Sequence, residues 1–473
     1  MTTQSLPSPA RVRSEITRNR LRAALAVLIL VSAGVVAASA SSGGLSTASK
    51  ESVPNAPPTE NHTVVTESGR AGTITAYAPD GEVLYYNNSR TKYFDVDPVE
   101  GEPLTVEYAT TDTIHTEGPN CGDPPCTRNV IERADLETGD VDVIYERYDY
   151  KEYAGEWHDF DRINETHLVV ADMVSDQVFV VNTETEVVEW LWDAQSDFPL
   201  EGGHSWPRDW AHINDVEYIE SGQMEGRIMA SLRNQDQVVF LDRQKGLLGN
   251  WTLGAENEHD ILHEQHNPDY IPESNGGPAV VVADSENGQI KEFQREDGEW
   301  NRTWLWEDDQ IQWPRDADRL PNGNTLITDT HGNRVIEVNE SGGIVWEVGS
   351  TLPYESERLE TGDESAGGQS AAELGYESRT AAEGGDGGGG DDSSAMFGFE
   401  PLEYLGGVVE WILPHRIYNA LLFVSPVWMG SSEFAAIGIA LLTGLAWVGL
   451  EIRWQLHDAG VRFRLPIYRQ GGN

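Results

Sequence analysis

His158-Asp-Phe-Asp-Arg-Ile163 is the first of four related phrases that decide the predicted fold. The other three are Asn214-Asp-Val-Glu-Tyr-Ile219, His266-Asn-Pro-Asp-Tyr-Ile271 and Arg315-Asp-Ala-Asp-Arg-Leu320. A second apolar stretch follows each phrase, at 167–170, 227–230, 279–282 and 325–328. Third stretches begin at Gln177, Gln237, Gln289 and Arg334, and Trp-rich last stretches include 188–192, 304–306 and 344–346. One structural unit therefore recurs along the chain.

Four short alternating stretches in a unit of about 40 residues are typical of a β-propeller blade. Two earlier stretches, near 72–111 and 112–154, have similar length and strand content but lack the phrase. With them included, we predict an all-β, six-bladed β-propeller over residues 60–350, with five or seven blades as alternatives. We interpret the Trp side chains as core between blades. The repeated acids are interpreted as structural ties between neighbouring blades: Asp161, Glu217, Asp269 and Asp318.

The composition is strongly acidic. The 473 residues include 32 Lys and Arg against 79 Asp and Glu, a formal net charge of −47. Such a balance excludes an ordinary nucleic-acid binder. Scarce lysine with surplus acid favours a halophilic source, with an ordinary acidic surface as the alternative. An apolar fraction of 39% and 15 Trp residues are enough to form a core, which excludes disorder for most of the chain.

The two chain ends each carry an apolar run. Residues 23–40 follow five arginines and are predicted to be a signal anchor or a cleavable signal peptide. Residues 434–450 are predicted to be a second transmembrane helix. The basic tails 1–22 and 451–473 are predicted to be cytoplasmic, with the propeller on the extracellular side of the cell membrane. Residues 401–430 are predicted to be an amphipathic segment, interfacial or packed on the anchor.

An acidic, Gly-rich linker is predicted over residues 351–400. Its central part, 361–394, is interpreted as a flexible tether because glycine and like charges keep a chain extended and mobile. Six N-x-Ser/Thr sequons favour an exported glycoprotein, and they begin at Asn61, Asn87, Asn164, Asn250, Asn301 and Asn339. Cys121 and Cys126 are predicted to form a small loop disulfide outside the cytoplasm.

Propeller topology predicts which polar residues meet. In a blade, the start of the first strand and the turn between the second and third strands lie at the same end. Seven candidates are therefore expected at one mouth of the propeller: His158, His212, Asn214, Arg233, His266, Arg315 and His331. Histidines and arginines together favour a site for a small anion. Satisfied structural polar residues are one alternative, and a three-His metal site is another, against which the two arginines argue. His259 and His263 are interpreted as loop residues outside the site.

Three motifs carry a family resemblance. Asp209-Trp-Ala-His-Ile-Asn-Asp215, Glu264-Gln-His-Asn-Pro268 and Leu320-Pro-Asn-Gly-Asn-Thr-Leu-Ile327 resemble the arylsulfotransferase family over about residues 72–350. Those enzymes are six-bladed propellers that transfer a sulfuryl group between phenols without a nucleotide sulfate. The resemblance implies His266 as the residue that takes the sulfuryl group, with His158 and His212 in support. It implies Asn214 as the neighbouring asparagine and Arg233 as the sulfate-binding arginine. We take Arg233, Asn214, Arg315 and His331 as the substrate-binding candidates.

The expected activity is therefore transfer from an aryl sulfate to a phenol through a sulfohistidine, with no cofactor, metal or nucleic acid. The expected partners are these small molecules and membrane lipid around the terminal helices. We do not expect the N-terminal β-domain and dimer arm of soluble family members in residues 1–473. Two rival functions are a non-catalytic adhesive propeller and a metal-dependent propeller hydrolase or lyase.

Overall fold

The computed structural model describes residues 9–42, 45–69, 71–150, 155–308, 310–380, 408–409 and 412–459. The described chain divides into two units. One contains residues 45–380 together with Asn419–Phe423, and it holds all the strands. The other is helical and contains segments from both chain ends. Each unit is described separately.

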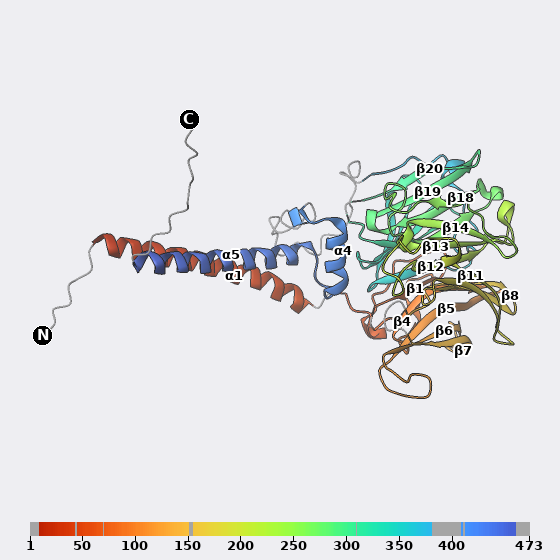
Figure 1. Ribbon diagram of the computed structural model, residues 1–473, viewed down its shortest axis with the longest axis horizontal. Coiled ribbons are helices and arrows are strands. Elements are labelled where there is room, and N and C mark those ends of the chain that lie inside the picture. The colour runs from red at the N-terminus through yellow and green to blue at the C-terminus, as the bar shows by residue number, and fades with distance from the viewer. Residues whose placement is uncertain are drawn as a thin grey trace. The chain divides into compact units, whose positions relative to one another are not determined.

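The strands form six sheets, which are the blades of a β-propeller (Figure 1). Blade 1 consists of β25 (Pro353–Arg358), β1 (Thr63–Glu67), β2 (Ile74–Tyr77) and β3 (Val83–Asn87). Blade 2 consists of β4 (Lys92–Val99), β5 (Glu102–Ile114), β6 (Cys126–Asp135) and β7 (Val141–Asp149). Blade 3 consists of β8 (Phe160–Asn164), β9 (His167–Asp172), β10 (Gln177–Asn182) and β11 (Val187–Asp193).

Blade 4 consists of β12 (Ile213–Tyr218), β13 (Ile228–Leu232), β14 (Gln237–Asp242) and β15 (Gly246–Leu247), and β16 (Leu253–Gly254) also pairs with β14. Blade 5 consists of β17 (His266–Ile271), β18 (Ala279–Asp284), β19 (Gln289–Glu296) and β20 (Glu299–Trp306). Blade 6 consists of β21 (Pro314–Arg319), β22 (Thr325–Asp329), β23 (Arg334–Val338) and β24 (Ile344–Gly349). Short 3-10 turns are η1 (Lys50–Ser52), η2 (Ala194–Ser196), η3 (Gly222–Met224), η4 (Arg233–Gln235), η5 (Glu273–Asn275) and η6 (Ser285–Asn287).

The predicted six-bladed propeller is confirmed, but its first two blades differ from the prediction. Blade 2 occupies residues 92–149, and blade 1 combines strands from 63–87 with the closing strand β25. The propeller therefore extends to Arg358 and not to residue 350. Strand β25 pairs with β1 from the opposite end of the chain, which closes the ring of blades.

All six blades carry the phrase, including the two in which it was not recognised. Blade 2 has Phe94-Asp-Val-Asp-Pro-Val99 and blade 1 has Tyr354-Glu-Ser-Glu-Arg-Leu359. We number the phrase residues from position 1, so that the residues at position 1 are Phe94, His158, Asn214, His266, Arg315 and Tyr354. The phrase lies on or just before the inner strand of each blade, and these strands contact one another around the propeller axis.

Two of the four repeated acids connect neighbouring blades. Asp161 accepts a hydrogen bond from the backbone N–H of Tyr218 at 2.5 Å, and Glu217 accepts one from Tyr270 at 2.7 Å. The predicted tie between blades is therefore confirmed for Asp161 and Glu217, whereas Oδ2 of Asp318 is buried without a partner. Asp269 instead accepts from the hydroxyl of Ser365, which lies beyond the last blade. Between the blades, buried Trp157, Trp210 and Trp306 belong to the core, as predicted.

Residues 361–380 do not form the flexible tether that their composition predicted. They contain the short helix α2 (Ala371–Leu374), and the N–H of Ala371 donates to Glu292 in strand β19. Ser365 and Ser370 are fully buried, and Tyr376 donates to the carbonyl of Gly323. Specific hydrogen bonds to the propeller thus outweigh the low apolar content. The rest of the predicted linker, 381–400, lies outside the described residues.

Two helices of the helical unit are long and apolar enough to cross a membrane, within α1 (Pro9–Ser42) and α5 (Ser431–Asp458). They pack side by side and antiparallel (Figure 1). Arg18 pairs with Asp458 at 2.6 Å at one end, and Ser39 donates to Glu433 at 2.7 Å at the other. This pairing places the N-terminal end of α1 beside the C-terminal end of α5. The predicted topology requires these two ends to lie on the same side of the membrane.

Helix α4 (His415–Val424) occupies part of the predicted amphipathic segment, and most of residues 401–414 lies outside the described residues. Its residues Asn419–Phe423 group with the propeller, where Asn419 donates to Glu286 at 3.0 Å. Elsewhere in the propeller unit, the predicted disulfide Cys121–Cys126 is formed. None of the six sequon asparagines is buried, and Asn164, Asn250 and Asn301 are exposed.

Candidate functional site

The first residues of the phrases come together at one end of the propeller axis. The ring of His158 lies 4.6 Å from that of Phe94 and 5.3 Å from that of Tyr354, between ring centres. Tyr354 also lies 6.5 Å from His266, and the Arg315 guanidinium stands 4.8 Å above its ring. Backbone bulges at the start of the inner strands, as in β17 between His266 and Asp269, allow neighbouring side chains to be re-aimed toward the axis.

The turns between second and third strands bring the other candidates to the same end, as the topology predicted. Arg233 begins η4, and its backbone N–H donates to the carbonyl of His212 at 3.2 Å. The ring of His212 lies 5.3 Å from that of His158. His331 lies 4.3 Å from Trp313, whose ring also faces Arg233, Arg315 and His266. The structure thus brings all seven predicted site residues together.

Hydrogen bonding assigns the tautomer of His266. Its Nδ1 lies 2.8 Å from Oγ of Ser285, and that hydroxyl donates its only proton to a backbone carbonyl, that of Pro314 at 2.6 Å. Nδ1 must therefore carry the proton and donate to Ser285, which leaves the lone pair on Nε2. Burial, followed by the positive charges of Arg315 and Arg233, holds the pKa of His266 well below its usual value. A neutral imidazole with a free Nε2 is the form that acts as a nucleophile.

His212 is held by a carboxylate. Its Nδ1 lies 2.6 Å from Oδ1 of Asp209, three residues earlier in the chain. Burial opposes ionisation of Asp209, but the charge and hydrogen bond of His212 outweigh it and lower the pKa of that carboxyl. Burial lowers the pKa of His212 as well, and Asp209 opposes that shift. An ionised carboxylate on Nδ1 fixes the ring, so that Nε2 can exchange a proton.

The two arginines have different surroundings. Arg233 forms an ion pair with Glu264 and donates through Nη1 to Asn234 at 3.1 Å. Arg315 donates to the hydroxyl of Ser68 at 2.6 Å, and among the described residues no carboxylate forms an ion pair with it. It is 7% exposed, and burial lowers its pKa to about 10. A buried guanidinium without a counter-charge is costly, so Arg315 is the better anion-binding candidate.

The remaining candidates line the same end with unused polar atoms. Asn214 is fully buried, donates to the carbonyl of Gln265 at 3.0 Å, and leaves its Oδ1 without a protein partner. Both ring nitrogens of His331 are buried and unpartnered, and burial followed by Arg315 lowers its pKa to about 3. Burial, followed by His212 and Arg315, likewise holds the pKa of His158 well below its usual value. These histidines are therefore neutral at physiological pH.

Sequence reasoning missed five residues of this site: Asp209, Glu264, Ser285, Trp313 and Tyr354. Asp209 and Glu264 lay within the quoted motifs, and their charge beside a candidate histidine was an available signal. Tyr354 stood at position 1 of an unrecognised phrase. Ser285 and Trp313 gave no signal, because their roles depend on contacts between blades. Phe423 of helix α4 also reaches this end, 6.1 Å from Trp313 between ring centres.

His259 and His263 lie apart from the site, as expected. Their rings stack 3.8 Å apart, and Nε2 of His259 lies 3.3 Å from Asp236. Within the described chain, two sets of buried carboxylates converge closely enough to hold a metal ion. None of the four site histidines belongs to either set. The geometry therefore gives no support to the three-His metal alternative.

Residues 160–297 match the arylsulfotransferase (ASST) family model. The match begins at strand β8 and ends after β19, so it contains His212, Asn214, Arg233 and His266. His158, Arg315 and His331 lie outside it. Together with the six-bladed fold, the arylsulfotransferase match supports an arylsulfotransferase-like function. No curated protein matches the chain.

Two similar solved structures have low sequence identity to this chain. A protein of unknown function from Bacteroides caccae has a TM-score of 0.44 and 10% identity, covering 63% of this chain and 99% of its own. A periplasmic gluconolactonase from Pseudomonas aeruginosa has a TM-score of 0.40 and 10% identity, covering 64% of this chain and 99% of its own. Similarities this distant do not bear on the activity.

Proposed function

We propose that the propeller is a nucleotide-independent sulfotransferase that moves a sulfuryl group from an aryl sulfate to a phenol through His266. The observation that carries the proposal is the neutral, buried imidazole of His266, with Nδ1 held by Ser285 and Nε2 unprotonated. It lies among arginines of which Arg315 has no carboxylate partner in the described chain. The family match over 160–297 supports the same activity.

In the first step, the lone pair on Nε2 of His266 forms a bond to sulfur while the bond from sulfur to the aryl oxygen breaks. The leaving phenolate takes a proton from the acid form of His212, which Asp209 stabilises across 2.6 Å. His158 is neutral and buried, so it supports the site by packing beside His212, with their ring centres 5.3 Å apart. Nδ1–H of His266 keeps its hydrogen bond to Ser285 and disperses the positive charge on the ring.

The sulfuryl oxygens need donors as their charge develops. Arg315, Arg233 and the amide of Asn214 supply N–H groups, and the low-polarity surroundings strengthen each hydrogen bond. The ion pair with Glu264 positions Arg233 and moderates its charge. His331, neutral and unpartnered, offers a further polar edge for the substrate. Trp313 and Tyr354 supply flat surfaces suited to an aromatic ring.

The second step reverses the first with a new acceptor. His212, now neutral, removes the proton of an incoming phenol, whose oxygen attacks sulfur as the bond from Nε2 to sulfur breaks. The electron pair returns to Nε2, and every group regains its starting protonation state. No cofactor is required by this cycle.

Intact-mass analysis of the full chain after brief exposure to a chromogenic aryl sulfate tests the proposal. We expect a sulfuryl adduct on His266, and loss of both adduct and turnover in His266→Ala. The control is His263→Ala, which removes a histidine outside the site and should keep full turnover. Retained turnover in His266→Ala would overturn the proposal. Binding of a partner without any turnover would favour the adhesive propeller, and loss of activity with chelator would favour a metal-dependent hydrolase or lyase.

We further propose that the propeller is extracellular and that membrane lipid surrounds α1 and α5. The antiparallel pairing of the helices and the arginines near their cytoplasmic ends, among them Arg18 and Arg22, support this orientation. The disulfide and the exposed sequon asparagines support an exported propeller.

A further inference from the structure

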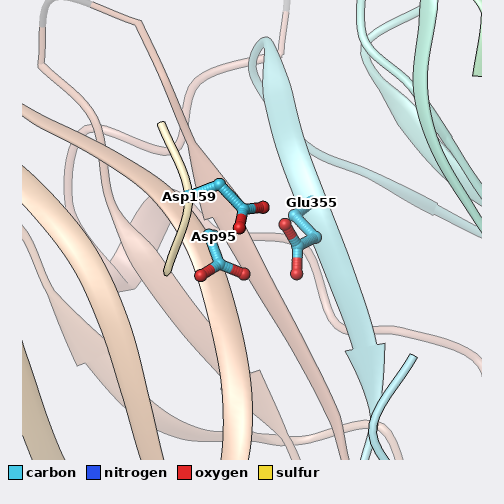
Figure 2. A group of neighbouring side chains, drawn as sticks. All are labelled: Asp95, Asp159 and Glu355. Carbon is cyan, nitrogen blue, oxygen red and sulfur yellow. The ribbon is translucent and has the colours of Figure 1, made fainter. Parts of the chain in front are cut away.

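A ring of oxygen-bearing side chains surrounds the propeller axis one residue beyond the proposed sulfotransferase site. Each blade contributes position 2 of its phrase: Asp95, Asp159, Asp215, Asn267, Asp316 and Glu355. All six are buried, each no more than 5% exposed. Carboxylate oxygens of Asp95, Asp159 and Glu355 all lie within 4.8 Å of one another. Figure 2 shows these three carboxylates, from three blades, turned toward a common centre.

The ring follows a hydrogen-bonding rule that explains its exceptions. In four blades, the position-2 carboxylate accepts from the backbone N–H at position 3 of the next blade. These pairs are Asp95 with Phe160 (3.2 Å), Asp159 with Val216 (3.1 Å), Asp316 with Ser356 (3.2 Å) and Glu355 with Val96 (3.2 Å). Asp215 meets Pro268 at that position, and proline has no N–H. The Oδ1 atom of Asp215 is therefore buried without a hydrogen-bond partner.

Asn267 is the second exception, and it points across the axis. Its Nδ2 donates to Oε2 of Glu355 at 3.0 Å, although blade 6 separates their blades. Its Oδ1 is buried without a partner, and the amide group that carries it contacts Glu355, one of the three convergent carboxylates. The backbone at Asn267 has a φ of 33°, in the left-handed range. Two orphaned oxygens, from Asp215 and Asn267, thus join the three convergent carboxylates.

The charge of this ring is not balanced by basic side chains. Among the described residues, no Lys, Arg or His forms an ion pair with any of the five position-2 carboxylates. Uncompensated buried charges are strongly unfavourable, so the ring needs either protons or a cation.

We propose that a hard divalent cation, best fitted by Ca²⁺, binds on the axis between Asp95, Asp159 and Glu355, with Asp215 and Asn267 completing its ligands. Every available ligand atom is an oxygen, which suits Ca²⁺ or Mg²⁺ and not a thiolate- or imidazole-binding metal. Oxygens opposed across Ca²⁺ are about 5 Å apart, in keeping with the spacing here. Ca²⁺ accepts six to eight oxygens in irregular geometry, whereas Mg²⁺ demands a regular octahedron and keeps several waters.

The cation joins blades that are remote in sequence. Glu355 lies on the closing strand β25, and Asp95 and Asp159 belong to blades 2 and 3. Its binding therefore stabilises ring closure, and it fixes the strand starts that carry His158 and Tyr354. This role differs from the sequence expectation of no metal. It does not rest on the proposed sulfotransferase activity.

The test uses the full chain purified in detergent in about 1 M KCl, where cations on the acidic surface are screened. Elemental analysis before chelation measures the cation that is already bound. After chelation, calorimetry and thermal unfolding with added CaCl₂ or MgCl₂ measure its binding. We expect one Ca²⁺ per chain and a melting temperature that rises with Ca²⁺ concentration, since a ligand of the folded state stabilises it. Asp95→Asn and Glu355→Gln should weaken binding by about tenfold or more.

The matched control is Glu184→Gln, which removes an exposed carboxylate in the turn between β10 and β11 and should leave Ca²⁺ affinity unchanged. The proposal is overturned if the wild-type chain shows no saturable Ca²⁺ binding and no thermal shift, because protons then balance the ring. Unchanged affinity in both ring variants, or saturable binding of Mg²⁺ but not Ca²⁺, would also overturn it. If the ring variants do not fold, the wild-type measurements decide.

Discussion

Ser285 fixes the proton of His266. The hydroxyl of Ser285 lies 2.8 Å from Nδ1 of His266 and gives its own proton to the carbonyl of Pro314. Ser285 lies in the turn between β18 and β19, and Pro314 opens β21 in the next blade. Packing of two blades therefore decides which nitrogen of the imidazole is free to react.

The first prediction concerns this positioning residue. In Ser285→Ala, Nδ1 loses its acceptor, so the imidazole can adopt the other tautomer or turn. We expect kcat for sulfuryl transfer to fall about ten- to a hundredfold, while KM for the donor changes little. The control is Ser356→Ala, which removes a similarly buried hydroxyl that bonds Thr328. An equal fall in kcat in both variants would show that removing any buried serine hydroxyl has this effect, and it would contradict a specific role for Ser285.

The second prediction concerns the pair formed by Asp209 and His212. In Asp209→Asn, the ring loses an ionised acceptor on Nδ1, and its acid form loses stabilisation. We expect kcat to fall by about 10²- to 10⁴-fold with a changed pH profile. Asp209 is 34% exposed, so thermal stability should change little. Glu189→Gln is the control, since Glu189 forms a similar pair with His167 away from the site. A silent Asp209→Asn would remove this dyad from the mechanism.

The third prediction compares the two arginines. Lysine keeps the charge but cannot donate two parallel hydrogen bonds to one sulfuryl group. We expect Arg315→Lys and Arg233→Lys each to lower transfer by roughly ten- to a thousandfold in folded protein. Arg315→Lys should have the larger effect, because Arg233 already shares its guanidinium with Glu264. An unchanged rate with normal melting would exclude the arginine concerned, and a lost fold would indicate a structural role.

The sequence predicted the fold and the site through the same repeat. Spacing of the phrases was enough to place His158, Asn214, His266 and Arg315 at one end, because strand order determines which loops are neighbours. It was not enough for blade 1, where Glu355 and Glu357 replace the usual aspartates and the strand comes from the far end of the propeller. Local composition could not reveal that closure.

Contacts between blades were beyond prediction. Asp209, Ser285 and Trp313 act through neighbours whose identity depends on packing. Residues 361–380 looked like a tether because they contain few apolar side chains. Their order comes from individual hydrogen bonds, such as those of Ser365 and Tyr376, and hydropathy does not register these. The orphaned oxygen of Asp215 likewise depends on a proline in the next blade.

The fourth prediction concerns the compartment. If the propeller is extracellular, Cys121 and Cys126 should be oxidised in the native cell, as they are in the structure. Cells are first quenched with acid. Alkylation of the intact protein after the quench, before and after reduction, then measures the oxidation state of the two cysteines. We expect modification only after reduction. Free thiols in freshly quenched cells would place the propeller in a reducing compartment and contradict the proposed orientation.

The last prediction concerns acid stability and His331. Burial and Arg315 lower the pKa of this histidine to about 3, whereas the unfolded chain has an ordinary value near 6.5. Between these values the unfolded state binds the proton and the folded state does not, so this residue lowers stability as the pH falls. At pH 4 the cost reaches at most about 3 kcal/mol of unfolding free energy.

The variant His331→Gln has no titratable group at this position. Its melting temperature should therefore decline less than that of the wild type between pH 7 and pH 4, measured by tryptophan fluorescence. His167→Gln, at a partly exposed histidine in blade 3, is the control and should follow the wild type. Parallel decline of His331→Gln and wild type would show that His331 gains a proton in the folded state, contrary to its buried, unpartnered ring.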